Sequence, residues 1–232
     1  MNDDAANAEP RAAATVLVVR RGGAGGPAVL MGQRGAAAAF MPSKYVFPGG
    51  ALDDADATVT LVQGLGETCR ARIEGGEAPG LAAALAAAAI RELWEETGLA
   101  LGQPGAATPR PDWNGFEATG LAPSAAGLRF FFRAITPPGR SRRFDARFFL
   151  ADASALAGDP DDFGRASDEL SHLHWVSVSE ARKLNLPFIT EVVLAELGAL
   201  LATAPGDAPL PLPASVPFFD NSGPVPTFRR IY

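Results

Sequence analysis

Hydrophobic positions cluster in short runs along the chain, separated by glycine- and proline-rich stretches. Residues 14–20 and 27–34 are apolar, β-rich runs joined by a glycine-rich turn, a pattern that predicts a β-hairpin. The same reasoning predicts further strands at 45–47, 128–135, 144–150 and 173–177.

The longest apolar run, Leu81–Ile90, continues into an acidic segment. It predicts a helix over about 79–97, with Gly98 as its natural stop. Two further helices are predicted at 179–183 and 191–202. Strands mixed with a few helices indicate an α/β fold, a sandwich around a mixed β-sheet.

Composition and the positions of glycine and proline divide the chain into three parts. With 232 residues, 47% of them hydrophobic and 20% charged, the sequence is typical of a soluble globular protein. We expect a single domain over 12–204, interrupted by an insertion at 57–79 that its glycines and proline mark as one or two helices joined by loops. The polar, acidic residues 1–11 predict a disordered N-terminus, and the proline-rich tail 205–232 shows no obvious regular structure.

The charge of the chain and its lack of visible targeting signals argue against several classes of protein. The formal net charge is −6, and the one basic run lies at 140–143, which argues against a general nucleic-acid binder. No secretory signal is visible, and Leu81–Ile90 is too short to span a bilayer. Cys69 is the single cysteine, so an intrachain disulfide cannot form. These features predict a cytoplasmic protein without a membrane partner.

The acidic end of the long predicted helix carries the most informative chemistry. Glu92, Glu95 and Glu96 stand at i, i+3 and i+4, so they share one helical face. Their charges repel one another and face the negative end of the helix dipole, which a divalent cation such as Mg²⁺ or Mn²⁺ would offset. A solvated acidic surface is the alternative, but the apolar residues before the cluster indicate a buried helix and therefore a site.

These residues resemble the Nudix hydrolases, whose signature is G-x5-E-x7-R-E-U-x-E-E-x-G-U, with U an aliphatic residue. Arg91–Leu99 matches the second half without a gap, and Gly50 matches the first glycine. Two departures stand out: Asp56 occupies the place of a glutamate, and the thirty-four residues 57–90 replace seven. The resemblance covers roughly residues 12–200. It implies a Nudix-type α/β/α sandwich with a helical insertion inside the signature.

The resemblance also implies roles for these residues. The metal ligands would be Glu92, Glu95, Glu96 and the carbonyl of Gly50, and the ion would be Mg²⁺ or Mn²⁺. Arg91 and Asp56 would form a supporting ion pair. Glu92 and Glu96 would be catalytic, and the general base would be either Glu92 or Glu169, which stands on a later loop.

The flanking segments resemble a narrower subgroup, related to peroxisomal coenzyme A diphosphatases, through residues 34–50 and 142–149. The substrate-binding candidates are Arg34, Phe40, Met41 and Arg143. The expected partner is a small-molecule diphosphate, with coenzyme A or an acyl-CoA first and ADP-ribose, nucleotide sugars or dinucleotides as alternatives. A Nudix-like ligand-binding domain without catalysis, and a homodimer, both stay open.

Overall fold

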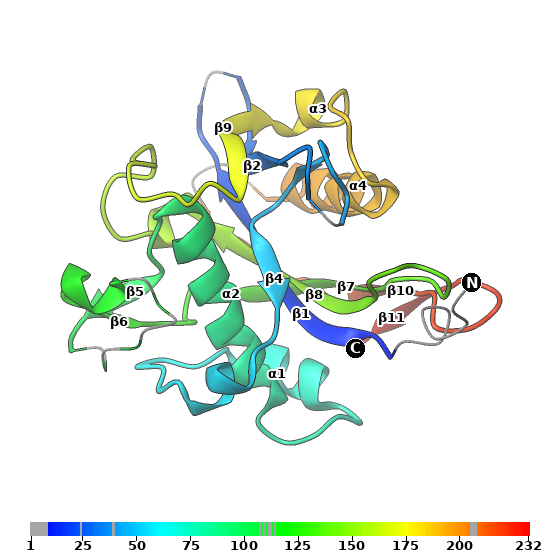
Figure 1. Ribbon diagram of the computed structural model, residues 1–232, viewed down its shortest axis with the longest axis horizontal. Helices are drawn as coiled ribbons and strands as arrows, with labels where there is room; N and C mark the ends of the chain where they lie inside the picture. Colours follow the sequence, from blue (N-terminus) through cyan, green and yellow to red (C-terminus); the bar gives the residue numbers. More distant parts are fainter. Residues whose placement is uncertain are drawn as a thin grey trace.

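A mixed β-sheet forms the centre of the molecule. The computed structural model describes residues 9–23, 25–38, 40–106, 108, 110, 113, 115–204 and 208–232, and nine strands within those residues join in one sheet (Figure 1). The main order is β11 (Thr227–Ile231), β10 (Val216–Asp220), β7 (Arg129–Ile135), β8 (Phe144–Asp152), β1 (Arg11–Arg20), β2 (Ala28–Arg34) and β3 (Tyr45–Val46). Off this path, β4 (Gly49–Ala51) pairs with β1 and β9 (Leu170–Ser177) pairs with β2.

Side chains of β1 alternate between two hydrophobic cores, one on each face of the sheet. Val16 and Val18 join the core that contains helix α2 (Leu81–Thr97), whereas Leu17 and Val19 join the core that contains helix α4 (Phe188–Ala202). All four side chains are fully buried, because a strand covered on both faces places every side chain against a packed layer. The predicted α/β sandwich around a mixed sheet is therefore confirmed.

Helix α2 is bounded by two glycines in the left-handed conformation. Gly80 precedes it with φ +87°, and Gly98 ends it with φ +76° and donates its N–H to the Trp94 carbonyl at 2.8 Å. Gly98 tolerates this backbone because it has no Cβ. The observed helix lies within two residues of the predicted one. None of the helices within the described residues is long and apolar enough to cross a bilayer.

The predicted insertion folds as one short helix with irregular connections. The 3₁₀-helix η2 (Asp54–Thr58) leads into it, and helix α1 (Glu67–Glu74) packs beside α2 and β7. The connection after α2 holds a small hairpin of β5 (Gly102–Pro104) and β6 (Leu121–Pro123), with η4 (Phe116–Thr119) between its strands. The remaining short elements are η5 (Ala153–Ala155) and α3 (Val178–Ala181).

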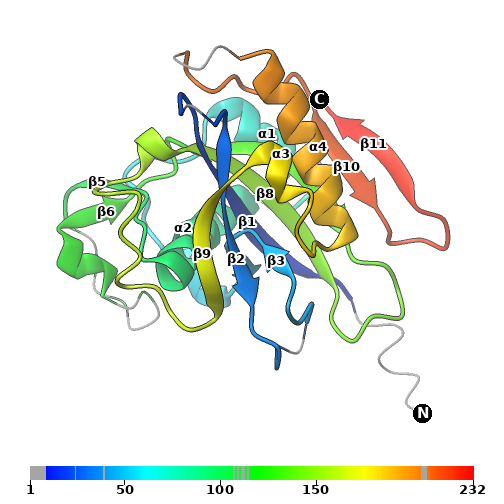
Figure 2. The ribbon, with the colours of Figure 1, turned by 90° about the horizontal axis from the view of Figure 1, so that it is seen from above.

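The expectation that the tail 205–232 lacks regular structure is wrong. Strands β10 and β11 pair antiparallel from Val216↔Ile231 to Asp220↔Thr227 (Figure 2). Strand β10 joins the sheet beside β7. Val216 and Phe218 are buried, so the tail completes the core. Of the N-terminal segment predicted to be disordered, residues 1–8 lie outside the described residues, and Arg11 already belongs to β1.

Candidate functional site

The glycine-rich strand β4 closes directly on the acidic end of α2. The Gly49 N–H donates to Glu96 Oε2 at 2.8 Å, and Glu96 is only 2% exposed. A Cβ on Gly50 would collide with the carboxylate of Glu92, and a Cβ on Gly49 would lie 2.5 Å from the Ala14 carbonyl oxygen. Only glycine therefore allows this backbone to approach both the carboxylates and strand β1.

Arg91 and Asp56 form a buried, bidentate ion pair next to strand β4. Arg91 Nε donates to Asp56 Oδ1 and Arg91 Nη2 to Asp56 Oδ2, both at 2.9 Å, and the Asp56 side chain is 0% exposed. Arg91 Nη2 also donates to the Ala51 carbonyl at 3.1 Å, which ties the helix to β4. The ion pair expected from the sequence is present despite the shorter aspartate, because η2 brings that residue against the helix.

The insertion does not disturb this arrangement. It leaves after η2 and returns at the start of α2, so Asp56 and Arg91 meet although 34 residues separate them. The added chain packs around the far end of α2 through α1.

Burial raises the pKa values of all three glutamates. It raises the pKa of Glu92 to about 7, with Arg91 opposing the shift and Glu95 adding to it. Burial, followed by repulsion from Glu92, holds the pKa of Glu96 well above its usual value. The pKa of Glu95 is raised by burial too, against the pull of Arg91. A nearby cation would favour the charged form of each carboxylate.

The three glutamates differ in their present partners. Arg91 Nη1 donates to Glu92 Oε1 at 2.9 Å and to Glu95 Oε2 at 3.3 Å, while Glu96 accepts from Gly49. Within the described part of the chain, no group of three His, Cys, Asp or Glu side chains is arranged closely enough to hold a metal ion. The carboxylates therefore share one region but are not preassembled as a ligand set.

Glu169 reaches the same region from the loop before β9. The Ser167 N–H donates to the Glu95 carbonyl at 3.1 Å, so this loop is fastened to the end of α2. Glu169 is exposed on the cleft, and its negative charge contributes to the raised pKa values of Glu92 and Glu96. Both candidates for the general base thus lie at one site.

A cleft of about 1380 Å³ opens in front of the glutamates. The predicted substrate-binding residues all line it: Arg34, Phe40, Met41 and Arg143. The positive charge of Arg34 partly opposes the rise in the pKa of Glu96 that burial causes. Arg143 is 9% exposed and donates from Nε to the Thr136 carbonyl at 3.1 Å. Phe40 packs edge-on against Phe144 with 5.3 Å between ring centroids.

Several cleft residues were not anticipated from the sequence, among them Phe188, Phe219 and Asn221. Phe188 begins α4, and Phe219 and Asn221 lie at the end of β10. The run Val216–Phe219 is rich in β-forming residues and was the available signal, but the surrounding prolines masked it.

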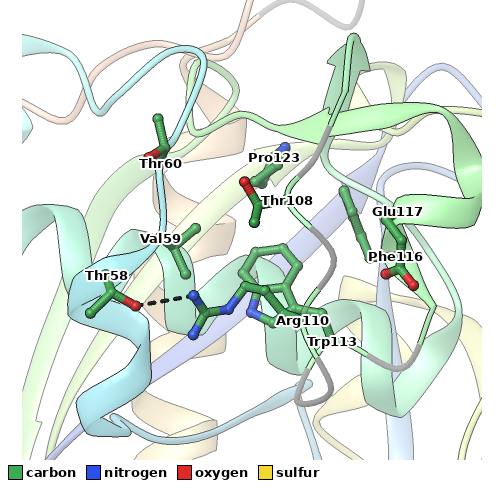
Figure 3. A pocket seen from close by; sticks show the side chains of 9 residues that line it. All are labelled: Thr58, Val59, Thr60, Thr108, Arg110, Trp113, Phe116, Glu117 and Pro123. Carbon is green, nitrogen blue, oxygen red and sulfur yellow. Dashed lines mark hydrogen bonds between the residues drawn. The ribbon is translucent and has the colours of Figure 1, made fainter.

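A second, smaller pocket of about 80 Å³ lies behind the ion pair, between η2 and η4 (Figure 3). Arg110 spans it, donating to Thr58 Oγ1 and to the Ala55 carbonyl at 3.0 Å each. Trp113 and Phe116 form its apolar wall, with their rings edge-on at 5.1 Å. The hydrogen bonds from Arg110 hold η2 in place, and η2 is the segment that carries Asp56.

Comparison with known proteins gives consistent matches. The family model described as the NUDIX domain matches residues 9–197. A Caenorhabditis elegans protein that bears the name nudix hydrolase 7 is 30% identical over 165 residues, which is 66% of this chain and 47% of that protein. The chain thus spans about half the length of this curated relative.

A solved structure supports the fold. The crystal structure of a NUDIX hydrolase from Alicyclobacillus acidocaldarius is similar with a TM-score of 0.62 and 28% identity, covering 82% of this chain and 92% of that one. The Nudix hydrolase RenU from M. smegmatis has a TM-score of 0.45 and 19% identity, covering 84% and 88% of the two chains.

Proposed function

Because this chain belongs to the NUDIX domain family, we propose that it is a divalent-metal-dependent hydrolase that cleaves a diphosphate linkage in a small molecule. The predicted family is confirmed, and the hydrolase names of its relatives support an enzyme rather than a purely binding domain. The observation that carries the proposal is the burial of Glu92 and Glu96 against Gly49 and Gly50, at the end of a large cleft.

The residues present fit a divalent ion by their chemistry. Carboxylate and carbonyl oxygens suit Mg²⁺ or Mn²⁺, and burial raises the pKa values of Glu92 and Glu96, a cost to their charged forms that a cation would offset. Glu96, Glu92 and the Gly50 carbonyl would hold the ion, with Glu95 joining them once it leaves Arg91. When bound, the ion would offset charge on the phosphoryl oxygens and acidify the attacking water.

The protein's own groups would orient the reaction and accept the proton. Arg91, fixed by Asp56, holds the carboxylates at the mouth of the cleft. Water forms a bond to phosphorus and the bridging phosphorus–oxygen bond breaks, which yields two phosphate monoesters. Either Glu92 or Glu169 takes the proton from the water.

Coenzyme A or an acyl-CoA is the substrate we propose first, and ADP-ribose, nucleotide sugars and dinucleotides are the alternatives. The resemblance of residues 34–50 and 142–149 to the coenzyme A diphosphatase subgroup supports this choice, as does the position of Arg34, Phe40 and Met41 on the cleft. The net charge of −6 argues against nucleic acid. We propose a cytoplasmic location on the same sequence grounds, with a homodimer left to measurement.

Product analysis on coenzyme A tests the substrate. The purified protein is incubated with coenzyme A and Mg²⁺ or Mn²⁺, and products are separated by chromatography. Formation of 3′,5′-ADP and phosphopantetheine is the expected result. No cleavage of coenzyme A beside rapid hydrolysis of ADP-ribose would exclude this substrate while keeping the enzyme class. Tight binding of these compounds without turnover would instead favour a ligand-binding domain.

A further inference from the structure

The large cleft extends well beyond the glutamates and changes character along its length. Its catalytic end carries Glu92, Glu96 and Arg34, whereas its far wall carries Phe188, Phe219 and several aliphatic side chains. Phosphates have reason to bind where charged side chains line the cleft, not against this apolar wall. The far wall is therefore available for another part of the substrate.

This far wall combines the start of α4, which the family match includes, with Phe219 and Asn221, which lie beyond it. The match ends at residue 197, while β10 covers Val216–Asp220 and β11 covers Thr227–Ile231. Strand β10 extends the sheet beside β7, and Figure 2 shows α4 lying along it. The two elements meet at Phe188 and Phe219, whose ring centroids are 6.0 Å apart.

The side chains of this wall are unusually apolar for a solvent-facing surface. Phe188 is 66% exposed, whereas Val193, Leu194 and Leu197 of the same helix are buried in the core. A large exposed aromatic side chain beside a cleft is typical of a binding surface. Asn221 lines the same wall with a polar amide and is 9% exposed. An amide at this position can donate to and accept from a polar group of a ligand.

Cationic side chains line the cleft as well. Arg140 and Arg142 are exposed on the loop between β7 and β8, and Lys44 lines the same cleft. These charges suit the phosphate groups of a substrate that extends past the metal-binding end.

We infer that β10 and the start of α4 form an apolar subsite for an alkyl or acyl group attached to the diphosphate, which makes the C-terminal strands a specificity element. The inference rests on the proposed hydrolysis of diphosphates. Phe188 and Phe219 contact the chain of the substrate, and Asn221 binds a carbonyl or amide at its edge.

Two esters of ADP that differ only in their terminal group provide the probes, namely methyl-ADP and octyl-ADP. Hydrolysis is measured with Mg²⁺, and binding is measured separately by calorimetry with Ca²⁺ in its place. Because each buried methylene favours binding, we expect the KM for octyl-ADP to be about tenfold lower than for methyl-ADP, with similar kcat.

Phe188→Ser should remove most of this preference, and so should Phe219→Ala. Phe228→Ser is the matched control, because Phe228 is 50% exposed and packs on Phe219 with centroids 6.2 Å apart, yet does not line the cleft. The control should keep the preference for octyl-ADP. Melting temperatures of all three variants identify any loss of folding.

The outcomes separate this inference from the proposed function. Hydrolysis of both esters with equal KM, or a preference unchanged in Phe188→Ser and Phe219→Ala, overturns the subsite. Tighter binding of diadenosine diphosphate than of octyl-ADP also overturns it, since the wall would then select a nucleobase. Tighter binding of octyl-ADP without any turnover supports the subsite and contradicts the hydrolase.

Discussion

The ion pair between Asp56 and Arg91 gives the most quantitative test of how the site is held together. In Asp56→Ala, the Arg91 guanidinium, 5% exposed, loses two hydrogen bonds of 2.9 Å, and the Asp53 N–H loses its acceptor at 2.9 Å. Removing one partner of a buried pair costs about 3–5 kcal/mol.

The lower end of that range applies here. Arg91 retains hydrogen bonds to Glu92, Glu95 and the Ala51 carbonyl, so its charge stays partly compensated. We therefore expect Asp56→Ala to lower the free energy of unfolding by about 3 kcal/mol. For a chain of this size, that loss corresponds to a fall of roughly 6–12 °C in melting temperature.

Urea unfolding and thermal melts with EDTA present provide the measurement. Asp54→Ala is the matched control, because Asp54 is exposed and lies on the same 3₁₀-helix. It should change stability by at most about 0.5 kcal/mol. A difference of less than 1 kcal/mol between the two variants would refute the claim that this buried pair braces the loop.

Four further substitutions test separate features of the structure. Glu92 has a pKa raised from 4.5 to about 7, so its proton stabilises the metal-free fold fully below pH 4.5, and this contribution is lost as pH rises through 7. Melts in EDTA should show that slope in the parent protein and a flatter one in Glu92→Gln; equal slopes would contradict the shift. Gly50→Ala drives a methyl group into the Glu92 carboxylate, so Mn²⁺ affinity measured by calorimetry should fall about tenfold or more, and unchanged affinity would place the ion elsewhere. Gly98→Ala forces a left-handed residue, φ +76°, to carry a side chain and should cost about 1–2 kcal/mol. Gly198→Ala, where nothing lies within 4 Å of the new methyl, should stabilise helix α4 by roughly 0.5–1 kcal/mol, and similar effects of the two alanines in urea unfolding would count against the first.

Local patterns were sufficient to predict the elements that carry the chemistry. The apolar run 81–90 followed by Glu92, Glu95 and Glu96 fixed both the helix and its acidic face, and Gly98 marked its end. The β-rich segment from residue 14 onward likewise became β1, buried on both faces. Short-range periodicity and caps encode such features, so they can be read without knowledge of the fold.

Features that depend on distant parts of the chain could not be predicted in this way. Strand β10 pairs with β7, more than 80 residues earlier, and its own sequence contains Pro217 between hydrophobic residues. The ion pair between Asp56 and Arg91 depends on how η2 packs against α2, and not on the number of residues between the two. The hydrogen bonds from Arg91 to Glu92 and Glu95 also depend on the three-dimensional fold, and the sequence signature alone does not predict them.

Turnover by Glu96→Gln tests the central claim most directly. The parent protein and the variant are compared on a panel of diphosphates with Mg²⁺ or Mn²⁺, with folding checked by melting temperature. The account predicts that the parent hydrolyses at least one compound, that excess EDTA stops it, and that the variant loses about 100-fold or more of the activity. Full activity in Glu96→Gln, or in excess EDTA, would contradict it.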